Sequence, residues 1–350
     1  MATIQDIADY VGLSIATVSR ALNKPAMVNA ETRERVMQAA KKLNYFDPAK
    51  TRQANLKNKK ISLGVIIPYI TSFFFGELFS GISRVAQENH IDLILYELKS
   101  SKMNEEGLAE AFSFVQRHLV DGIILTSFHL PAKYDELIDT LQIPVVLLLD
   151  SHESGKLPTY KVDDIRASFE AVSYLVSRGH RNIGMISALL TDQHDRGEQL
   201  RLKGYKQAVD FYGLPFSEAL VAYGDMRFED GYTAMKELLG NREETGLTAV
   251  FAASDEMAIG AMRCIFDAGL KVPEDISVIG FDNLSVSRIT MPKLTTIEQP
   301  FGEIGAEGVK HMIRWFTEGG QIPEKGQFYL PYKIIERESV AEIHPGEART

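Results

Sequence analysis

The chain has 350 residues, of which 45% are hydrophobic and 24% charged, a composition typical of globular proteins that excludes a disordered chain, a collagen and a disulfide-stapled miniprotein. At roughly 100–200 residues per domain, this length predicts two or three domains. The single cysteine, Cys264, excludes an intrachain disulfide and a paired-cysteine metal site. The apolar stretches are shorter than the ~18 residues of a membrane span, and the first residues do not resemble a signal peptide, so we expect a cytoplasmic protein.

Charge is divided unevenly along the chain. The net charge is −9 overall, but the first 60 residues hold 11 Lys and Arg against 5 Asp and Glu. A basic N-terminal module on an acidic body favours a local contact with nucleic acid. Chance unevenness is the simpler alternative.

The N-terminal region predicts a helix-turn-helix. Apolar residues at helical spacing indicate helices over residues 3–11, 15–22 and 30–43. Thr3, Ser14 and Asn29 stand at the N-cap positions of these helices. Gly12 can adopt the positive φ of the tight turn between the first two helices.

In a helix-turn-helix, the N-terminal part of the second helix contacts bases in the major groove. Arg20 can donate two hydrogen bonds to guanine, worth about 1–3 kcal/mol of discrimination. Ile15 and Ala16 suit thymine methyl groups. The candidate DNA contacts are Thr3, Ser14, Ile15, Ala16, Thr17, Ser19, Arg20 and Asn23. A three-helix bundle without DNA function is the alternative interpretation.

Residues 49–60 follow a helix-ending Asp47-Pro48 pair and are rich in Lys and Arg, with Leu56 as the single large apolar residue. Such a segment cannot bury itself. It is either a solvated linker or a short hinge that orders on DNA, with Leu56 as a wedge in the minor groove.

The N-terminal sequence then shows a distinctive pattern over residues 3–8, 12–14, 16–20, 22–23, 32–33 and 43–45. This pattern resembles the headpiece of the LacI/GalR family of repressors. The resemblance implies a homodimer on a pseudo-palindromic operator, with Leu56 as the hinge leucine that inserts at the operator centre. The family's usual Ala-Arg-x-Leu is replaced here by Gln53-Ala54-Asn55-Leu56.

From residue 61 onward, strands and helices alternate. We expect strands over residues 61–67, 91–95, 122–125, 145–149, 182–187, 220–222, 249–253 and 277–281. We expect helices over residues 76–88, 105–118, 134–141, 167–176, 200–211, 230–239 and 256–267. This alternation predicts two α/β lobes with parallel sheets, and a ligand site beyond the carboxyl ends of the strands.

Several polar residues follow these predicted strands. Asp150, Ser254 and Asp282 each come directly after or close to a strand end, and Arg201 begins a helix. An arginine, several carboxylates and the aromatic run 73–75 suit a neutral, hydroxyl-rich ligand. The simpler alternatives are a helix cap for Ser254 and Asp255, and a place in the core for the aromatic run.

The family resemblance extends over the body, in segments such as 64–68, 178–183, 279–283 and 294–299. It implies a periplasmic-binding-protein-like core. Matching the family's effector positions gives Phe74, Phe75, Asp150, Arg201, Ser254, Asp282 and Gln299. This chain departs from many sugar-responsive members, because it has Ser254 in place of Asn and Met226 in place of a stacking aromatic residue.

The resemblance also implies a domain organisation. We expect a headpiece over 1–48, a hinge over 49–60, a core over 61–340 and a tail over 341–350. The first lobe then comprises about 61–160 and 300–325, and the second 161–299 and 326–340, with residues 327–335 as its final strand. The helix over 76–88 is expected at a dimer interface, and the tail lacks the leucine heptads of a tetramerising helix.

Motifs of other classes of function are missing from the sequence. It contains no phosphate-binding Walker loop, GxSxG, HExxH or Cys/His cluster, which argues against an enzyme, a metal site or a cofactor. A periplasmic sugar receptor would need an export signal. A regulator commanded by a phosphorylated carrier protein is a further alternative, but Phe301-Gly302-Glu303 replaces the Tyr-Asp pair of catabolite control proteins. We therefore predict a repressor of carbohydrate-utilisation genes whose effector is a small sugar or sugar phosphate.

Overall fold

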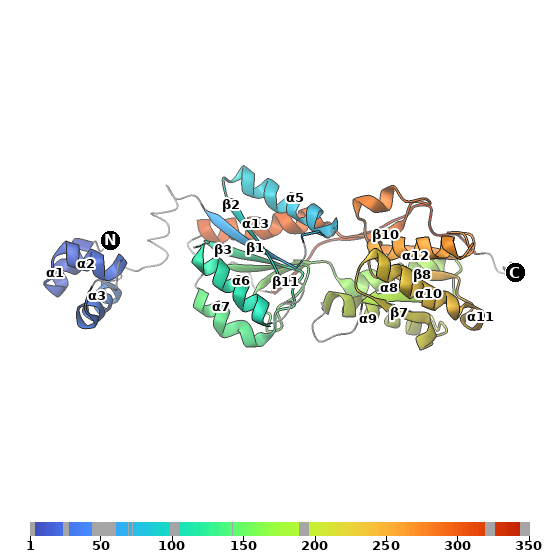
Figure 1. Ribbon diagram of the computed structural model, residues 1–350, viewed down its shortest axis with the longest axis horizontal. Helices are drawn as coiled ribbons and strands as arrows, with labels where there is room; N and C mark the ends of the chain where they lie inside the picture. The colour runs from blue at the N-terminus through green and yellow to red at the C-terminus, as the bar shows by residue number, and fades with distance from the viewer. Residues whose placement is uncertain are drawn as a thin grey trace. The chain divides into compact units, whose positions relative to one another are not determined.

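The structure is a computed structural model, and it describes residues 4–23, 28–43, 61–68, 70–71, 73–98, 105–118, 120–141, 143–188, 196–318 and 326–343. Thr3, Leu56 and the rest of the predicted hinge lie outside these residues. The chain divides into two compact units, one with the N-terminal helices and the other with both β-sheets. Figure 1 labels the elements in chain order.

The described N-terminal region forms the three predicted helices: α1 (Ile4–Val11), α2 (Ile15–Asn23) and α3 (Ala30–Lys42). The Thr17 N–H donates to Ser14 Oγ at 3.2 Å, and the Thr32 N–H donates to Asn29 Oδ1 at 2.8 Å, so both caps are confirmed. Gly12 has a φ of +66°, as the predicted turn requires. The buried apolar residues of the three helices form one small core, made of Ile7, Ala8, Val18, Ala21, Val36, Ala39 and Ala40.

The first lobe is built on a six-stranded sheet within the described residues, in the order β11-β5-β4-β3-β1-β2, with every neighbouring pair parallel. Its strands are β1 (Ser62–Ile67), β2 (Asp92–Glu97), β3 (Gly122–Thr126), β4 (Val145–Leu148), β5 (Pro158–Lys161) and β11 (Gly326–Tyr329). The central strands are buried on both faces, because helices cover both sides of the sheet.

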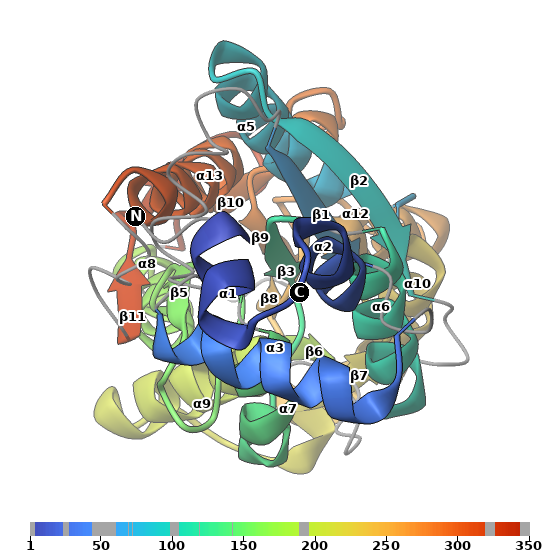
Figure 2. The ribbon, with the colours of Figure 1, turned by 90° about the vertical axis from the view of Figure 1, so that its left-hand side faces the viewer.

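Helices α5 (Phe73–Glu88) and α13 (Phe301–Thr317) cover one face of this sheet, and α6 (Glu105–Arg117) and α7 (Asp135–Leu141) cover the other (Figures 1 and 2). A short 3₁₀ turn, η3 (Ala132–Tyr134), precedes α7. Helices α5 and α13 approach so closely that a Cβ on Gly81 would overlap the backbone carbonyl of Gly302. These two helices therefore form a tightly packed pair.

The second lobe has a six-stranded sheet within the described residues, in the order β12-β10-β9-β8-β6-β7. Its strands are β6 (Ile183–Ala188), β7 (Val221–Gly224), β8 (Ala249–Ala252), β9 (Ser277–Asp282), β10 (Thr295–Glu298) and β12 (Lys333–Ile335). The described pairings are parallel, except that β12 runs antiparallel to β10. The largest of the apolar cores fills this lobe, and Phe251, Phe281 and Tyr205 are fully buried in it.

Two helix pairs cover this second sheet: α8 (Asp164–Ser177) with α9 (Arg196–Phe211), and α10 (Phe228–Gly240) with α12 (Asp255–Asp267). A Cβ on Gly204 would overlap the Ile165 carbonyl, and a Cβ on Gly231 would overlap the Met257 backbone, so each pair packs at close range. The short elements are α11 (Arg242–Thr245), η4 (Glu218–Leu220) and η5 (Ser285–Arg288).

The prediction of one final strand over residues 327–335 in the second lobe is wrong. The structure has two strands there, of which β11 pairs with β5 in the first sheet and β12 pairs with β10 in the second. Pro331 lies between them and cannot donate to a strand ladder, so the chain breaks and crosses between the lobes at this point. Strand β5 was not predicted, because its four residues include Pro158 and Lys161 and show no strand pattern.

Two helices start three residues earlier than predicted. Helix α8 begins at Asp164, because Asp163 caps it by accepting a hydrogen bond from the Arg166 N–H. Helix α5 begins at Phe73 and so includes the whole predicted aromatic run. No helix in the described part of the chain combines the length and the apolar composition that a membrane span needs.

Candidate functional site

Helix α2 presents most of the predicted DNA contacts on its accessible side. Val18 and Ala21 are buried in the headpiece core, whereas Ile15, Ala16 and Arg20 are exposed. Thr17 and Ser19 are half-buried, and Asn23 ends the helix. The Ser14 hydroxyl caps the helix and lies 2.8 Å from Thr17 Oγ1. Among its described side chains, the exposed surface of α2 therefore consists of two apolar ones, Ile15 and Ala16, and Arg20. This is the helix that the sequence predicts in the major groove.

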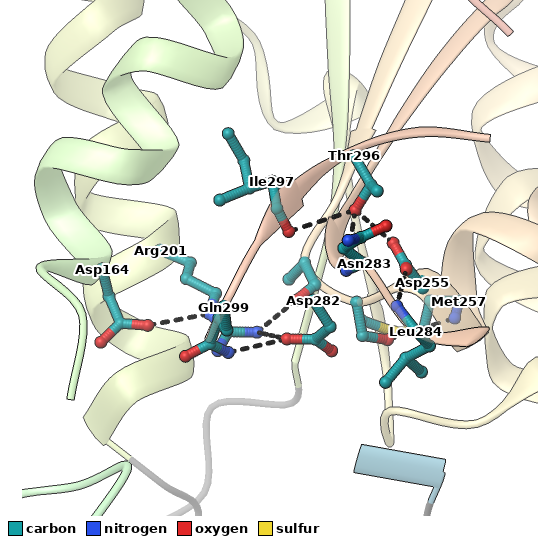
Figure 3. A network of polar contacts seen from close by, with 12 residues as sticks. Asp164, Arg201, Asp255, Met257, Asp282, Asn283, Leu284, Thr296, Ile297 and Gln299 are labelled. Atoms are coloured by element: carbon teal, nitrogen blue, oxygen red, sulfur yellow. Dashed lines mark hydrogen bonds and ion pairs between the residues drawn. The ribbon is translucent and has the colours of Figure 1, made fainter. Parts of the chain in front are cut away.

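In the second lobe, Arg201 on α9 is the centre of a buried polar cluster (Figure 3). Its Nε–H donates to Asp164 Oδ1 at 3.0 Å, and its Nη1 donates to the Ala253 carbonyl at 2.5 Å. The guanidinium carbon lies 3.9 Å from the centre of the Phe281 ring, a cation–π contact. Arg201 is thus held by a carboxylate, a carbonyl and an aromatic face.

Asp282 and Gln299 complete this cluster. Gln299 Nε2 donates to Asp282 Oδ1 at 2.7 Å, and Arg201 Nη1 lies 3.7 Å from the same oxygen. Burial raises the pKa of Asp282 to about 7, although Arg201 and the Gln299 hydrogen bond act in the opposite direction. Asp282 has a φ of +120°, which is strained for a residue with a Cβ.

The cluster lies at one edge of the second sheet. Ala253 follows β8, Asp282 ends β9 and Gln299 follows β10, and these three strands are neighbours. Their carboxyl ends therefore meet where the sequence predicts a ligand site. Three of the predicted effector residues, Arg201, Asp282 and Gln299, are brought together there.

Lys161 and Asp164 were not predicted as site residues from the sequence. Lys161 Nζ lies 3.1 Å from Asp164 Oδ2, and the two side chains are only 3% and 2% exposed. Lys161 ends β5 of the first sheet, whereas Asp164 begins α8 of the second lobe. The available signal was the Asp163-Asp164 pair at a helix start: one carboxylate caps the helix, which leaves the second for another role.

Ser254 and Asp255 have different roles. Ser254 is the N-cap of α12, with its Oγ accepting from the Met257 N–H at 3.2 Å. Asp255 instead holds the turn after β9: it accepts from the Leu284 N–H at 2.7 Å and from the Thr296 hydroxyl at 2.5 Å (Figure 3). Burial raises the pKa of Asp255 well above its ordinary value. The helix cap considered for both residues is therefore confirmed for Ser254, and it is wrong for Asp255.

The other predicted effector residues make contacts within the first lobe. Phe75 is 4% exposed and its ring stacks on Phe79, while the Phe74 ring lies 5.8 Å from that of Phe301. Asp150 is fully buried just beyond β4, with His129 Nδ1 3.7 Å from its Oδ1. Its Oδ2 has no hydrogen-bond partner among the described residues. An effector role for these three residues stays a prediction.

No group of three or more His, Cys, Asp or Glu side chains within the described ranges is arranged to hold a metal ion.

A helix-turn-helix unit joined in one chain to two α/β lobes, with a buried polar cluster at a sheet edge, defines a DNA-binding regulator with a ligand-receptor body.

Comparisons with known proteins agree with this class. Residues 3–47 match the family described as bacterial regulatory proteins, lacI family, and residues 172–340 match a periplasmic binding protein-like domain. Catabolite control protein A of Priestia megaterium is 32% identical, over 96% of this chain and 98% of its own length. The HTH-type transcriptional repressor CytR of Escherichia coli is 36% identical, over 98% and 97% respectively.

Solved structures show the same architecture. The transcriptional regulator CelR in complex with cellobiose aligns with a TM-score of 0.71 at 26% identity, covering 97% of this chain and all of that one. The Lac repressor dimer bound to operator and the anti-inducer ONPF aligns with a TM-score of 0.72 at 26% identity, covering 97% and 99%. This chain belongs to the LacI family of DNA-binding transcriptional regulators. The predicted fold class and the prediction of a regulator in place of an enzyme are confirmed.

Proposed function

We propose that this protein is a homodimeric repressor of carbohydrate-utilisation genes, acting in the cytoplasm and controlled by a small sugar or sugar phosphate. The observation that carries the proposal is the buried Arg201–Asp282–Gln299 cluster at the carboxyl edge of β8, β9 and β10. Relatives with the same architecture include regulators solved with cellobiose and with ONPF. The proposed domain organisation is a headpiece over 1–48, a hinge over 49–60 and a core over 61–340.

The chemistry of the cluster favours an uncharged effector. Arg201 and Gln299 supply N–H donors, and Asp282 supplies a carboxyl acceptor, all at least nine-tenths buried. A sugar hydroxyl can accept from the Arg201 guanidinium and donate to the Asp282 carboxylate, and such charge-assisted hydrogen bonds are strong where water is excluded. The two buried cations, Lys161 and Arg201, already face Asp164 and Asp282, so an added phosphate would meet carboxylates as well as cations. A neutral sugar is therefore preferred over a sugar phosphate.

DNA binding is assigned to the headpiece of each protomer. In the proposed complex, Arg20 reads a base pair in the major groove and Leu56 widens the operator centre from the minor groove. Helix α5 is the proposed dimer contact. In the second lobe, Ile289 and Met291 are 81% and 96% exposed, which adds apolar surface that a second copy could cover.

The start of α13, Phe301-Gly302-Glu303, does not favour binding of a phosphorylated carrier protein. Phe301 is buried against the Phe74 ring, and Gly302 lies against α5, so this part of α13 is occupied by packing within the first lobe. A small molecule therefore remains the proposed effector.

The proposal is tested by a ligand screen on the intact protein. An inverted-repeat duplex is first selected from random DNA, and neutral sugars are then compared with their phosphates by thermal shift, with and without that duplex. An effector at 100 times its Kd stabilises the protein by about 2.7 kcal/mol. We expect one sugar class to raise the melting temperature and to change duplex affinity. Arg201→Lys should abolish this response, whereas the exposed Arg263→Ala should keep it.

Failure to prefer any inverted-repeat duplex over random DNA, or an undiminished response in Arg201→Lys, would contradict the proposal.

A further inference from the structure

The N-terminal end of α5 points toward the second lobe (Figure 1). The Ser285 N–H, at the start of η5 in the second lobe, donates to Glu77 Oε1 of α5 at 2.9 Å. These residues are 208 positions apart in the sequence. A side chain of the first lobe thus satisfies a backbone donor at the start of a helical turn in the second lobe.

A second contact runs in the opposite direction. Burial raises the pKa of Glu256, in the first turn of α12, and the backbone N–H of Phe73, at the first residue of α5, partly offsets this rise. The first N–H groups of a helix have no partner within that helix, so a carboxylate from elsewhere is favourable there. The Phe73 N–H therefore favours the charged form of an acid of the second lobe.

An aromatic contact accompanies these two polar interactions. The rings of Phe73 and Phe228 meet edge to face, with centroids 5.9 Å apart and planes at 87°. Phe228 begins α10, which packs at close range on α12. The N-terminal end of α5, residues 73–77, therefore meets three elements of the second lobe: α10, α12 and η5.

Each side of this junction is firmly attached to its own lobe. Helix α5 packs on α13 through the close approach of Gly81 and Gly302. Helix α12 packs on α10, where a Cβ on Gly260 would overlap the Phe228 carbonyl. Next to Ser285, Leu284 donates its N–H to the buried carboxylate of Asp255. The contacts therefore join two packed bodies, and a relative movement of the lobes changes all of them together.

We propose that Glu77 and Glu256 are positioning residues that form a reciprocal clasp, in which an acid of each lobe caps a helical start in the other and so stabilises the arrangement in which the two lobes meet. The clasp, defined as Glu77–Ser285, Glu256–Phe73 and Phe73–Phe228, opens and closes as one unit. It goes beyond the proposed function, because it does not depend on which effector binds. It connects α5, the proposed dimer contact, to the lobe that contains the Arg201 cluster.

Hydrogen exchange at single-residue resolution tests the clasp on the full-length protein without any ligand. The probes are the amides of Phe73 and Ser285. Glu77→Ala removes the acceptor of Ser285 directly, so the informative amide is the remote one, Phe73. We expect Glu77→Ala to speed exchange at Phe73 roughly fivefold, the factor that corresponds to one net hydrogen bond. Glu256→Ala should speed exchange at Ser285 in the same way.

Two further variants separate a clasp from general destabilisation. Glu88→Ala, at the exposed end of the same helix, should leave both amides as in the unmodified protein. Glu256→Gln keeps an acceptor oxygen and should retain the protection of both amides, which also covers the case in which Glu256→Ala does not fold.

Addition of the selected operator duplex should change exchange at Phe73 and Ser285 by the same factor. The clasp is overturned if Glu77→Ala affects Ser285 alone, or if the duplex moves one amide without the other.

Discussion

Asp164 accepts the Arg201 Nε–H at 3.0 Å, and both side chains are almost completely withdrawn from solvent. This ion pair joins the first residue of α8 to the first part of α9. It also connects Arg201 to Lys161 of the first sheet, through the second oxygen of Asp164. The proposed effector arginine is therefore held in place from the point where the chain crosses between the lobes.

The Asp164–Arg201 pair should be strongly coupled in stability. Removing either partner takes away one buried charge-assisted hydrogen bond, while Asp164 keeps Lys161 and Arg201 keeps Asp282, so each single variant should lose about 1.5–3 kcal/mol of unfolding free energy. We expect the double variant Asp164→Ala/Arg201→Ala to lose less unfolding free energy than the two single variants lose together. The difference is the coupling energy, about 1–3 kcal/mol. Urea denaturation of the four proteins measures it.

The exposed pair Arg263–Asp267 on α12 is the matched control, and its coupling should be about 0.3–0.5 kcal/mol. Additive losses for Asp164 and Arg201 would show that the two side chains do not act as a pair.

Asp282 should make the folded state less stable as pH rises from about 4 to 7. Its pKa is raised from 3.8 to about 7 in the folded chain, chiefly by burial, so the folded state binds more protons than the unfolded state in this window. Stability then falls with rising pH, by at most about 1.4 kcal/mol per pH unit for one proton. In Asp282→Asn this part of the slope should vanish.

Denaturation midpoints of both proteins across this pH range provide the measurement. Asp255 contributes in the same direction, and the charge of Asp282 helps to raise its pKa, so the difference between the two slopes reports Asp282 together with its effect on Asp255. Parallel pH profiles would contradict the assignment.

Arg20→Ala should relax base preference at one pair of symmetric operator positions. The exposed side chain on α2 can donate two hydrogen bonds to guanine, and their loss removes about 1–3 kcal/mol of discrimination. Selection from a random duplex library at fixed salt, followed by affinity measurements, reports the change. The exposed Arg33→Ala on α3 serves as the control and should leave the preferred sequence unaltered. An Arg20→Ala protein that selects the original sequence would remove Arg20 from base reading.

Ser254→Ala should destabilise the second lobe by about 1 kcal/mol, because the Met257 N–H loses its capping oxygen. Asn is an equally good N-cap, so Ser254→Asn should retain stability. Thermal unfolding of the three proteins compares them. Equal melting temperatures for the unmodified protein and Ser254→Ala would mean that the cap makes no measurable contribution to stability.

Local signals in the sequence determined the headpiece and most elements of the lobes. Ser14 and Asn29 cap helices within three residues of themselves, and Gly12 turns the chain where it stands, so these features need no distant partner. Long apolar runs such as β1 and β3 also predict strands from local residues alone. Family resemblance, together with the rule that ligands bind at carboxyl strand ends, predicted Arg201, Asp282 and Gln299 as effector residues.

Only the tertiary structure decided which segments meet. The short strand β11 joins the first sheet and β12 the second, because backbone pairing with β5 and β10 selects the lobe and their own residues do not. A buried Lys161 has no local signature, since its burial depends on the Asp164–Arg201 pair that only folding assembles. The hydrogen bond from Ser285 to Glu77 spans 208 residues, a separation at which propensity and periodicity carry no information.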